Sequence, residues 1–452
     1  MDLEGLANRL LEKGAPDDRV IERLVLEIQT YKNLDSFSAG RMAESILKEV
    51  RNARKKVDDP IVRTVLTAPN AGATMHDLGV GCRGDGDFFV HKLIADIAGK
   101  NSLIPPEQQD DAGAVNISGL AGISGKGGKG GKIIVASVDG THSRLSDFPF
   151  IAGFHVARAA MRDVIVKGAT PVALIDDLHL SDDGDVGKLF DFVAGIAAVA
   201  ELTGVPLIAG STLRTGGDMV IGTRMVSSVG CIGVADRLLK RADVKTGDCI
   251  LMTEGSGGGT IATTAIYSGD MGAVKETFNV DFIKAANALF EKGLAKGIHC
   301  MLDVTNGGLR GDANEVCKTA GVGMAFEEAK IRTAVNKRVF DMLKKLDIDY
   351  LGVSLDSLLI FCAEKDKAAI MKALKSKKMN VSEVGRVIKG DRAFLDGREF
   401  KPKFRESAYT PVKKLVGEAA PGKERELKEG ARVAAGHSKE KMEKLVEYVK
   451  KK

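Results

Sequence analysis

The fold of this chain is decided by residues 135–171, VASVDGTHSRLSDFPFIAGFHVARAAMRDVIVKGATP. The stretch continues an apolar run that starts at Ile133 and leads to Asp139 and Gly140, which is typical of a buried strand that delivers a carboxylate at its end. A helix is expected next, because apolar residues recur at helical spacing: Phe150, Phe154, Ala157, Met161 and Val164. The pattern predicts a strand followed by a helix with one buried face.

Acidic residues follow each of these elements. Asp163 lies off the apolar stripe, on a helix face that it shares with small residues, so we expect another backbone to approach it closely and bury it in part. The sequence GATP at 168–171 ends the helix, since Gly provides a cap and Pro prevents continuation. The next strand, residues 172–175, leads to Asp176 and Asp177. Carboxylates at a strand, a helix and a second strand predict a divalent-metal site.

Composition sets limits on the class of protein. The 452 residues are 44% hydrophobic and 28% charged, which is typical of a globular chain with room for two core domains and extensions. The absence of Trp and the presence of just five Tyr argue against an aromatic platform for nucleic acid. No apolar run reaches the length of a membrane span. Six dispersed Cys without a CxxC motif predict reduced thiols in a cytoplasmic protein.

Three motifs resemble those of aminoimidazole ribonucleotide synthetase. DGTHSRL at 139–145 resembles the Asp-Gly-Val-Gly-Thr-Lys-Leu signature of that family, Asp163 matches the aspartate of its Asn-Asp pair, and 168–171 resembles its Gly-Ala-x-Pro. The wider superfamily includes thiamine-monophosphate kinase, selenophosphate synthetase and the hydrogenase maturation protein that dehydrates a carbamoyl group. The resemblance implies a two-domain α/β fold (more closely α+β) that binds ATP with magnesium, usually in an interface of a homodimer.

The resemblance also assigns metal ligands. QDDAGAV at 109–115 matches the superfamily's Asp-Asp-Ala-Ala-Val motif, with Gly113 in place of Ala. It implies that Asp110 and Asp111 begin the first strand and bind the metal ions that bridge ATP phosphates. Magnesium prefers hard anionic oxygens and usually shares them with phosphates. Asp139 and Asp163 complete the expected Mg²⁺ site and are also expected to act in catalysis.

The nucleotide is expected near Thr141 and His142. The sequence GVPLIAGST at 204–212 resembles the family's Gly-x-x-Leu-Ile-Gly-Gly-Glu-Thr, which assigns Gly210 and Thr212 to ATP binding. Two positions depart from the family: Ser211 stands where it has an acid, and Arg162 where it has Asn. These replacements leave open whether turnover is retained.

The glycine-rich loop 119–132, GLAGISGKGGKGGK, has two interpretations. No Gly-x4-Gly-Lys-[Ser/Thr] can be threaded through it, so it is not a P-loop. It is either a solvated tip between two strands, or a lid in which Lys126, Lys129 and Lys132 close over the triphosphate.

A second group of motifs lies in the carboxyl-terminal half. LDVTNGGL at 302–309 resembles the Asp-x-Thr-x-Gly-Gly-Leu of the hydrogenase maturation enzyme and thiamine-monophosphate kinase. It implies that Asp303 and Asn306 face substrate across the domain cleft and act in catalysis. EGSGGGT at 254–260 predicts a turn into a helix, either an anion site formed by free amides or a simple tight turn. Cys82 remains open between a structural thiol and a nucleophile.

Both ends of the chain show helical patterns. We expect a helical amino-terminal extension over 1–66, an ATP-binding and dimerisation α/β domain over 67–235 that closes with a strand from Met219 to Val234, a second α/β domain over 236–400, and a charged helical tail over 401–452. The first extension is either an adaptor or an arm that packs on its own domain. The tail is either solvated or docks a protein partner.

The favoured function is ATP- and Mg²⁺-dependent phosphoryl transfer to, or activation of, a small-molecule substrate, by a homodimeric enzyme of transferase or kinase type. Catalysis by positioning and charge neutralisation suits a site that is rich in acids and lacks an obvious nucleophile. The alternative is a nucleotide-binding regulatory or assembly paralogue without turnover.

Overall fold

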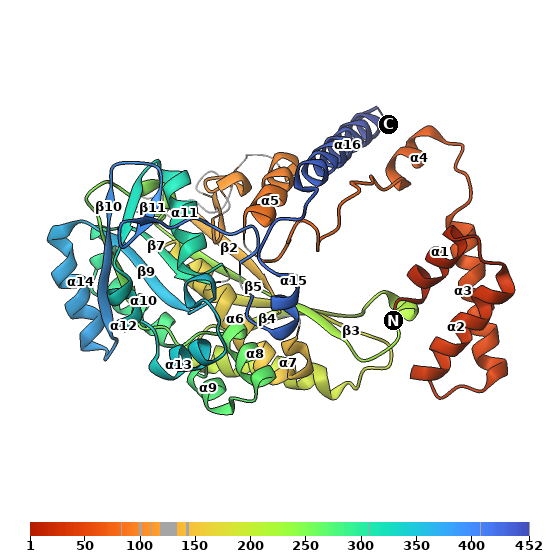
Figure 1. Ribbon diagram of the computed structural model, residues 1–452, viewed down its shortest axis with the longest axis horizontal. Helices are drawn as coiled ribbons and strands as arrows, with labels where there is room; N and C mark the ends of the chain where they lie inside the picture. The colour runs from red at the N-terminus through yellow and green to blue at the C-terminus, as the bar shows by residue number, and fades with distance from the viewer. Residues whose placement is uncertain are drawn as a thin grey trace.

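Two β-sheets form the centre of the molecule, and helices surround them (Figure 1). The computed structural model describes residues 1–82, 84–98, 102–108, 110–117, 133–141, 144–305, 307–406 and 408–451. The first sheet has the strand order β1-β2-β5-β3-β4, and the second has the order β12-β11-β8-β10-β6-β9-β7. The expected α/β architecture with helical extensions at both ends is confirmed.

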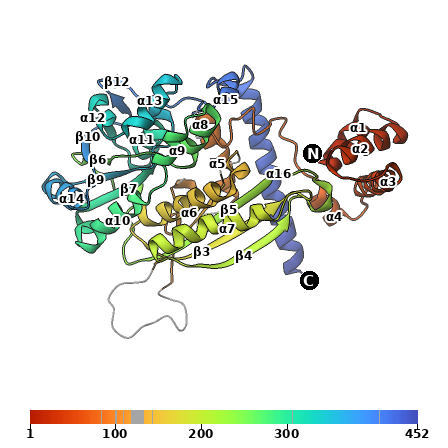
Figure 2. The same ribbon diagram turned by 90° about the horizontal axis from the view of Figure 1, so that it is seen from below.

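The first sheet carries two helices on one face (Figure 2). Its strands are β1 (Gly113–Asn116), β2 (Ile133–Gly140), β3 (Thr170–Leu180), β4 (Leu207–Arg214) and β5 (Met225–Ala235). The covering helices are α6 (Pro149–Val166) and α7 (Gly187–Thr203). The strand–helix–strand order expected around residues 135–171 is confirmed. Most pairs in this sheet are antiparallel, and β3 and β4 are parallel.

One strand boundary differs from the expectation. The strand expected to start at Met219 starts at Met225, and Gly217–Met219 forms a 3-10 turn. Residues 220–221, between this turn and β5, bind the amino terminus of the chain instead of extending the strand. The Met1 amine donates to the carbonyl of Ile221 at 2.7 Å, and Asp2 forms a β-bridge with Val220.

The second sheet is larger and is enclosed by helices. Its strands are β6 (Cys249–Thr253), β7 (Ile298–Val304), β8 (Gly323–Phe326), β9 (Ser357–Cys362), β10 (Val381–Ile388), β11 (Ala393–Leu395) and β12 (Arg398–Glu399). Its helices are α8 (Gly259–Ser268), α9 (Met271–Glu276), α10 (Asp281–Glu291), α11 (Gly308–Ala320), α12 (Glu328–Thr333), α13 (Lys337–Lys345) and α14 (Glu364–Ser376). Within the described ranges, no helix is both long and apolar enough to cross a membrane.

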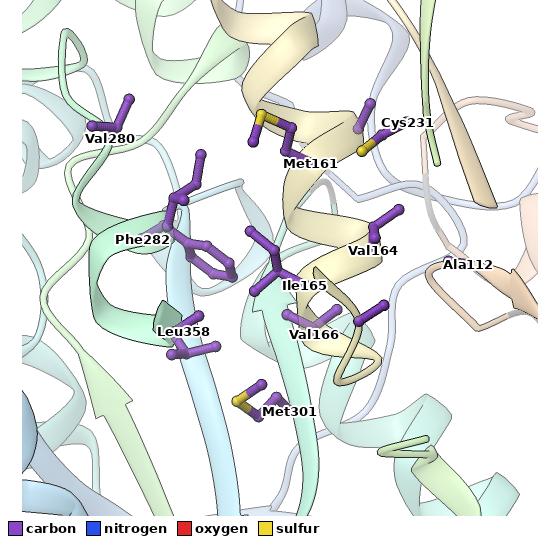
Figure 3. Packing of buried hydrophobic residues seen from close by; sticks show 14 of the residues in the cluster. Ala112, Met161, Val164, Ile165, Val166, Cys231, Val280, Phe282, Met301 and Leu358 are labelled. Atoms are coloured by element: carbon purple, nitrogen blue, oxygen red, sulfur yellow. The ribbon is translucent and has the colours of Figure 1, made fainter. Parts of the chain in front are cut away.

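Helix α6 joins the two halves through a shared core. Figure 3 shows Val164 on the side of α6 that faces Cys231 of β5, and Ile165 on the side that faces Phe282 of α10. The same cluster extends to the second sheet through Met301 and Leu358. Because apolar surface surrounds this helix, its polar residues are buried as well, which explains how charged groups on α6 come to line an internal site.

The amino-terminal extension folds as a small bundle with its own core. Helices α1 (Leu3–Glu12), α2 (Asp17–Tyr31) and α3 (Ser36–Ala53) pack around leucine and isoleucine side chains, and Ile221 of the first sheet's loop completes that core. Lys32, which follows α2, forms ion pairs with Asp182 and Asp183 in the loop after β3. The distance from Lys32 Nζ to Asp183 Oδ1 is 2.9 Å. These contacts agree with an arm that packs on its own domain. The bundle leaves Phe37 exposed on its surface.

The carboxyl-terminal segment fastens an early helix onto the body. Helix α5 (Asp85–Ala98) begins where Asp85 N donates to Lys403 O at 3.1 Å and Gly86 N donates to Phe404 O. The tail helix α16 (Glu424–Lys450) then packs on α5, and Arg432 stacks over Phe89. The chain between α3 and α5 contains α4 (Pro60–Leu66), and α15 (Pro411–Val416) precedes α16. Residues far apart in sequence therefore fix α5 in place.

Glu406 of this segment gives a pH-dependent contribution to stability. Burial raises its pKa from 4.5 to about 7, although Arg310, whose Nη1 lies 3.0 Å from Glu406 Oε2, opposes that rise. Because the folded pKa exceeds the unfolded one, the folded state binds more protons in this window, so the free energy of unfolding falls as pH rises from about 4.5 to about 7. We expect the wild type to lose up to about 3 kcal/mol relative to Glu406→Gln over that range, measured by urea unfolding. Parallel pH profiles for the two proteins would contradict this prediction.

Candidate functional site

An acid-lined cavity of about 460 Å³ lies between the two halves of the molecule. Three parts of the chain contribute to its wall: the first sheet with α6, the segment around α5, and loops of the second sheet. Its lining includes Gly81, Asp87, His91, Asp110, Asp111, Val138, Asp139, Gly140, His155, Arg162, Asp163, Gly259, Thr260, Thr305, Ser354 and Asp356.

The four acids expected to bind metal all line this cavity. Asp110 and Asp111 precede β1, Asp139 lies near the end of β2, and Asp163 lies in α6. Strand pairing explains their approach, because β1 runs antiparallel to β2 with Gly113 opposite Ala136, so the residues before β1 run toward Asp139. Helix α6 is held against β2 by Ser137, whose Oγ donates to the Ala160 carbonyl at 2.8 Å.

Two buried cations occupy the first acid pair. Lys167 Nζ lies 2.6 Å from Asp110 Oδ1 and 2.9 Å from Asp111 Oδ2. Arg241 Nη2 lies 2.6 Å from Asp111 Oδ1, and its Nε lies 3.2 Å from Asp110 Oδ1. Arg241 also forms an ion pair with Glu315 of α11. Burial opposes the charge on Lys167, but the two carboxylates outweigh it and raise the pKa of this lysine.

The second acid pair has a different environment. Burial raises the pKa of Asp163 well above its ordinary value, and the negative charges of Asp303, Asp139 and Asp111 raise it further, while Arg162 opposes the shift. A partly buried carboxylate among like charges is stabilised either by a proton or by a cation. A proton or a bound cation near Asp163 would therefore stabilise this carboxylate.

A buried arginine pair crosses from α6 to the second half. Arg162 Nε donates to Asp303 Oδ2 at 3.0 Å, and Arg162 Nη1 lies 2.5 Å from Asp356 Oδ2. Arg158, one turn earlier, reaches the same Asp356 oxygen at 3.2 Å. Burial would raise the pKa of Asp356, but Arg162 and Arg158 outweigh that effect and lower it. The cavity thus has positive charge on Arg162 opposite its acids.

Other expected site residues lie elsewhere. Thr141 follows β2 and its Oγ1 lies 2.6 Å from Ser227 Oγ, outside the cavity lining. Gly210 and Thr212 are exposed on β4, the edge strand of the first sheet. Asp303 is buried behind Arg162 and is not part of the lining. His142, Asn306 and the loop lysines Lys126, Lys129 and Lys132 lie outside the described residues.

The structure also places Asp177 and Cys82. Asp177 is half exposed beside His179 on β3, 3.0 Å from its ring nitrogen, and it does not line the cavity with Asp139. Cys82 follows Gly81 at the cavity wall, and burial raises the pKa of its thiol. A raised pKa lowers the thiolate fraction, which favours the structural interpretation of this cysteine.

Several residues in or beside the cavity were not assigned to the site from the sequence. Asp87 and His91 stand one turn apart on α5, with His91 Nε2 3.4 Å from Asp87 Oδ1, and the i,i+4 spacing was available as a signal. Arg158 and Arg162 have the same spacing on α6. Lys167 carried no such signal, because its partners are distant in sequence.

The donor set fits a divalent ion. The carboxylates offer hard oxygen ligands, and Asp110 Oδ2 is buried without a hydrogen-bond partner among the described residues. No three acid or histidine ligand atoms of this cavity, however, lie within 4.8 Å of one another; in the described ranges, such a group is formed by Cys249, Glu364 and Glu383. Lys367 and Arg386 already pair with those two glutamates, at 3.0 and 3.1 Å from Glu383.

A larger hollow of about 700 Å³ lies beside α13 and the carboxyl-terminal segment. Its charged groups neutralise one another, since Lys403 Nζ lies 3.2 Å from Asp349 and 2.7 Å from Glu418. The acid-lined cavity holds the four acids that the sequence motifs assign to the metal, and for that reason we take it as the candidate site.

Comparison with known proteins agrees with this assignment of motifs. Residues 109–235 match the family described as AIR synthase related protein, N-terminal domain, and residues 245–398 match its C-terminal domain. An uncharacterized protein of Methanocaldococcus jannaschii is 50% identical, with 100% of this chain and 98% of that protein covered. Carbamoyl dehydratase HypE of Rhodobacter capsulatus is 27% identical over 48% of this chain and 63% of its own length.

A solved structure shows the same fold. The structure of AaThiL complexed with AMPPCP and TMP has a TM-score of 0.52 and 18% identity, and the match covers 70% of this chain and 96% of that one. The two matched regions together contain the strands of both sheets up to Arg398 and most of the cavity lining, whereas Gly81, Asp87 and His91 precede them. The chain belongs to the AIR synthase related family.

Proposed function

We propose that this protein binds ATP with a divalent ion, Mg²⁺, in the acid-lined cavity, and that it transfers a phosphoryl group to, or activates, a small-molecule substrate. The observation that carries the proposal is the convergence of Asp110, Asp111, Asp139 and Asp163 from separate elements on one cavity. A protein of the same fold supports it, since AaThiL has been solved in complex with AMPPCP and TMP.

The chain's own residues have distinct roles in this proposal. Asp139 and Asp163 hold the divalent ion, which when bound neutralises phosphate charge and orients the nucleotide. The amino terminus of α8 presents Gly259 and Thr260 to the same cavity, and Gly258 provides no side-chain cap there, so backbone amides are available to an anion. Arg162 adds positive charge at the wall. Asp303 positions Arg162.

The alternative, a nucleotide-binding regulatory or assembly protein without turnover, draws support from the same arginine. Arg162 replaces the Asn of the family's Asn-Asp pair, and its guanidinium is committed to Asp303 and Asp356. The exposed Phe37 of the amino-terminal bundle and the exposed Leu415 of α15 support a protein partner at the terminal extensions.

Calorimetry and product analysis test both functions. ATP should bind in MgCl₂ and fail to bind in excess chelator, and incubation with a small-molecule extract of cells should yield ADP or AMP. Binding without any nucleotide product would favour the alternative. Equal ATP affinity with chelator present would overturn the metal-bridged site itself.

We also propose a homodimer formed through the open face of the first sheet. Val138 and Ile175 lie opposite Gly230 from its two sides and therefore share one face, the face that α6 and α7 leave uncovered. Val226, four residues before Gly230 on β5, extends that apolar surface. Val138 is 71% exposed, Ile175 is 38% exposed and Val226 is 56% exposed. Apolar surface of this extent favours burial against a second copy.

Sedimentation tests the dimer. The wild type is expected to sediment as a dimer at micromolar concentration and Val226→Lys as a monomer, because a lysine charge would be buried in the interface. Phe190→Lys is the matched control, since Phe190 is exposed on α7, on the opposite side of the sheet. A monomeric wild type would contradict the prediction.

A further inference from the structure

Two cysteines of the second sheet lie directly opposite each other. Cys249, the first residue of β6, pairs with Cys362, the last residue of β9, in an antiparallel ladder. Residues opposite each other in such a ladder have side chains on the same face of the sheet, with Cβ atoms about 4.5–5.5 Å apart. Both side chains are fully buried, and within the described ranges the Cys362 thiol has no hydrogen-bond partner. The same end of the two strands therefore carries a pair of buried, reduced thiols.

Two carboxylates lie beside this thiol pair. Cys249 Sγ donates to Glu364 Oε2 at 3.1 Å, and ligand atoms of Cys249, Glu364 and Glu383 all lie within 4.8 Å of one another. Three elements provide these residues: β6, the first turn of α14, and β10. Zinc takes sulfur at about 2.3 Å and carboxylate oxygen at about 2.0–2.2 Å, so small side-chain rotations bring the three atoms onto one ion. Thiolate ligands favour an ion of the zinc type over Mg²⁺.

The two carboxylates are already balanced by two cations. Lys367 pairs with both Glu364 and Glu383, and Arg386 does the same. All four side chains are at least 22% exposed, so these ion pairs are weak and their charged groups can shift. A carboxylate also offers about four lone-pair sites, so a bound ion can share the oxygens with Lys367 and Arg386.

The thiols supply the negative charge that a divalent ion needs. Burial raises the pKa of Cys249 and that of Cys362 to about 12, so without an ion both are neutral thiols. Each thiol gives up its proton to solvent when its sulfur ligates the ion, and two thiolates then balance a charge of +2. Asp366 adds negative charge near Cys362, as does Asp248, which pairs with His299. The group therefore takes up a divalent ion without a net gain of positive charge.

We propose that the second sheet carries a structural site for one divalent ion of the zinc type, with one ligand from each of four residues: Cys249, Cys362, Glu364 and Glu383. Four protein ligands close the coordination sphere, as in structural zinc sites, and leave no open position for a substrate. The ion joins β6, β9 and β10 to α14 and so stabilises the second half. The described lining of the acid-lined cavity includes none of the four residues, so this site is independent of the proposed function.

Co²⁺ is the probe of this site, because a cobalt–thiolate bond gives an ultraviolet charge-transfer band that oxygen ligands lack. The full-length chain, reduced and freed of metal by a chelator that is then removed, is titrated with Co²⁺ in excess MgCl₂. The wild type should develop the band up to one ion per chain, and Zn²⁺ should remove it. Cys249→Ser should lose the band. Cys317→Ser is the matched control and should keep it, because Cys317 is a buried thiol on α11.

Three further variants test the ligand set and its place in the fold. Cys362→Ser should keep about half of the band per bound ion, because one of the two thiolates remains. Glu383→Gln should bind Co²⁺ at least about 10-fold more weakly, since even groups that merely support metal ligands contribute 10–100-fold. Asp139→Asn should keep the whole band, because Asp139 belongs to the acid-lined cavity.

The band in the wild type decides first. A folded, reduced wild type without the band would overturn the proposal, and so would a Cys249→Ser protein that keeps the band of the wild type. If Cys249→Ser does not fold, Glu383→Gln decides the question, because position 383 is partly exposed and tolerates the carboxamide. Equal Co²⁺ affinity for Glu383→Gln and the wild type would then overturn the ligand set.

Discussion

Asp139→Asn is expected to abolish magnesium-dependent ATP binding while the protein stays folded. Asp139 lines the cavity beside Asp163, and its charge is one of the causes that raise the pKa of Asp163. Removing it deletes one proposed metal ligand and one of the negative charges that act on Asp163. We expect ATP affinity in MgCl₂ to fall by about 100-fold or more, since even groups that merely support metal ligands contribute 10–100-fold.

The same substitution should act in the opposite direction without metal. A neutral Asn no longer repels Asp163, so the variant should be as stable as the wild type or more stable in chelator, and Mg²⁺ should no longer raise its melting temperature. Calorimetry gives the ATP affinity and differential scanning fluorimetry gives the melting temperatures. Asp177→Asn is the matched control, because Asp177 is an acid of the same sheet that does not line the cavity. ATP affinity equal to that of the wild type would show that the metal-bridged site is wrong.

Arg162→Met should cause the largest loss of stability among single charge removals at the site. The substitution leaves Asp303 behind with its carboxylate 1% exposed, and it removes the shorter of the two arginine contacts to Asp356. Removing one partner of a buried pair costs about 3–5 kcal/mol, because the remaining buried charge loses that partner without being hydrated instead. Urea unfolding measures this cost.

A second substitution distinguishes charge from packing. Asp303→Asn added to Arg162→Met should restore part of the lost stability, because it removes the buried negative charge that Arg162 no longer neutralises. In the double-mutant cycle, the combined loss of stability should therefore be smaller than the sum of the two single losses. Arg386→Met is the control: Arg386 also pairs with two acids, Glu364 and Glu383, but its side chain is 49% exposed, so a loss of about 0–1 kcal/mol is expected. Equal losses for the two arginines would contradict the prediction.

The fold and the four acids were predictable because their signals are local. Residues 135–171 encode a strand, a helix and a stop within one short stretch, and the structure has all three. Asp139 and Asp163 are placed by that stretch, and the antiparallel partner strand brings Asp110 toward them. The resemblance supplied the order of the motifs, and the family match supports it.

The positive charges of the site were not predictable, because their partners lie far along the chain. Lys167 is 57 residues from Asp110, and Arg241 is 130 residues from Asp111. Neither pair has a sequence spacing that predicts contact within one helix or strand, and each forms only when the tertiary structure packs. The late start of β5 has a similar origin, since residues next to Val220 bind the amino terminus instead of extending the strand.

The attachment of α5 to the carboxyl-terminal segment fixes when the cavity is completed during synthesis. Asp87 and His91 emerge from the ribosome early, yet the first turn of their helix is held by the backbone of Lys403 and Phe404. Until those residues have been made, α5 lacks the surface on which it packs, although the first sheet already has all its strands. We therefore expect the nascent chain to form the first sheet before this wall of the cavity, so that an incomplete polypeptide does not contain the finished cavity.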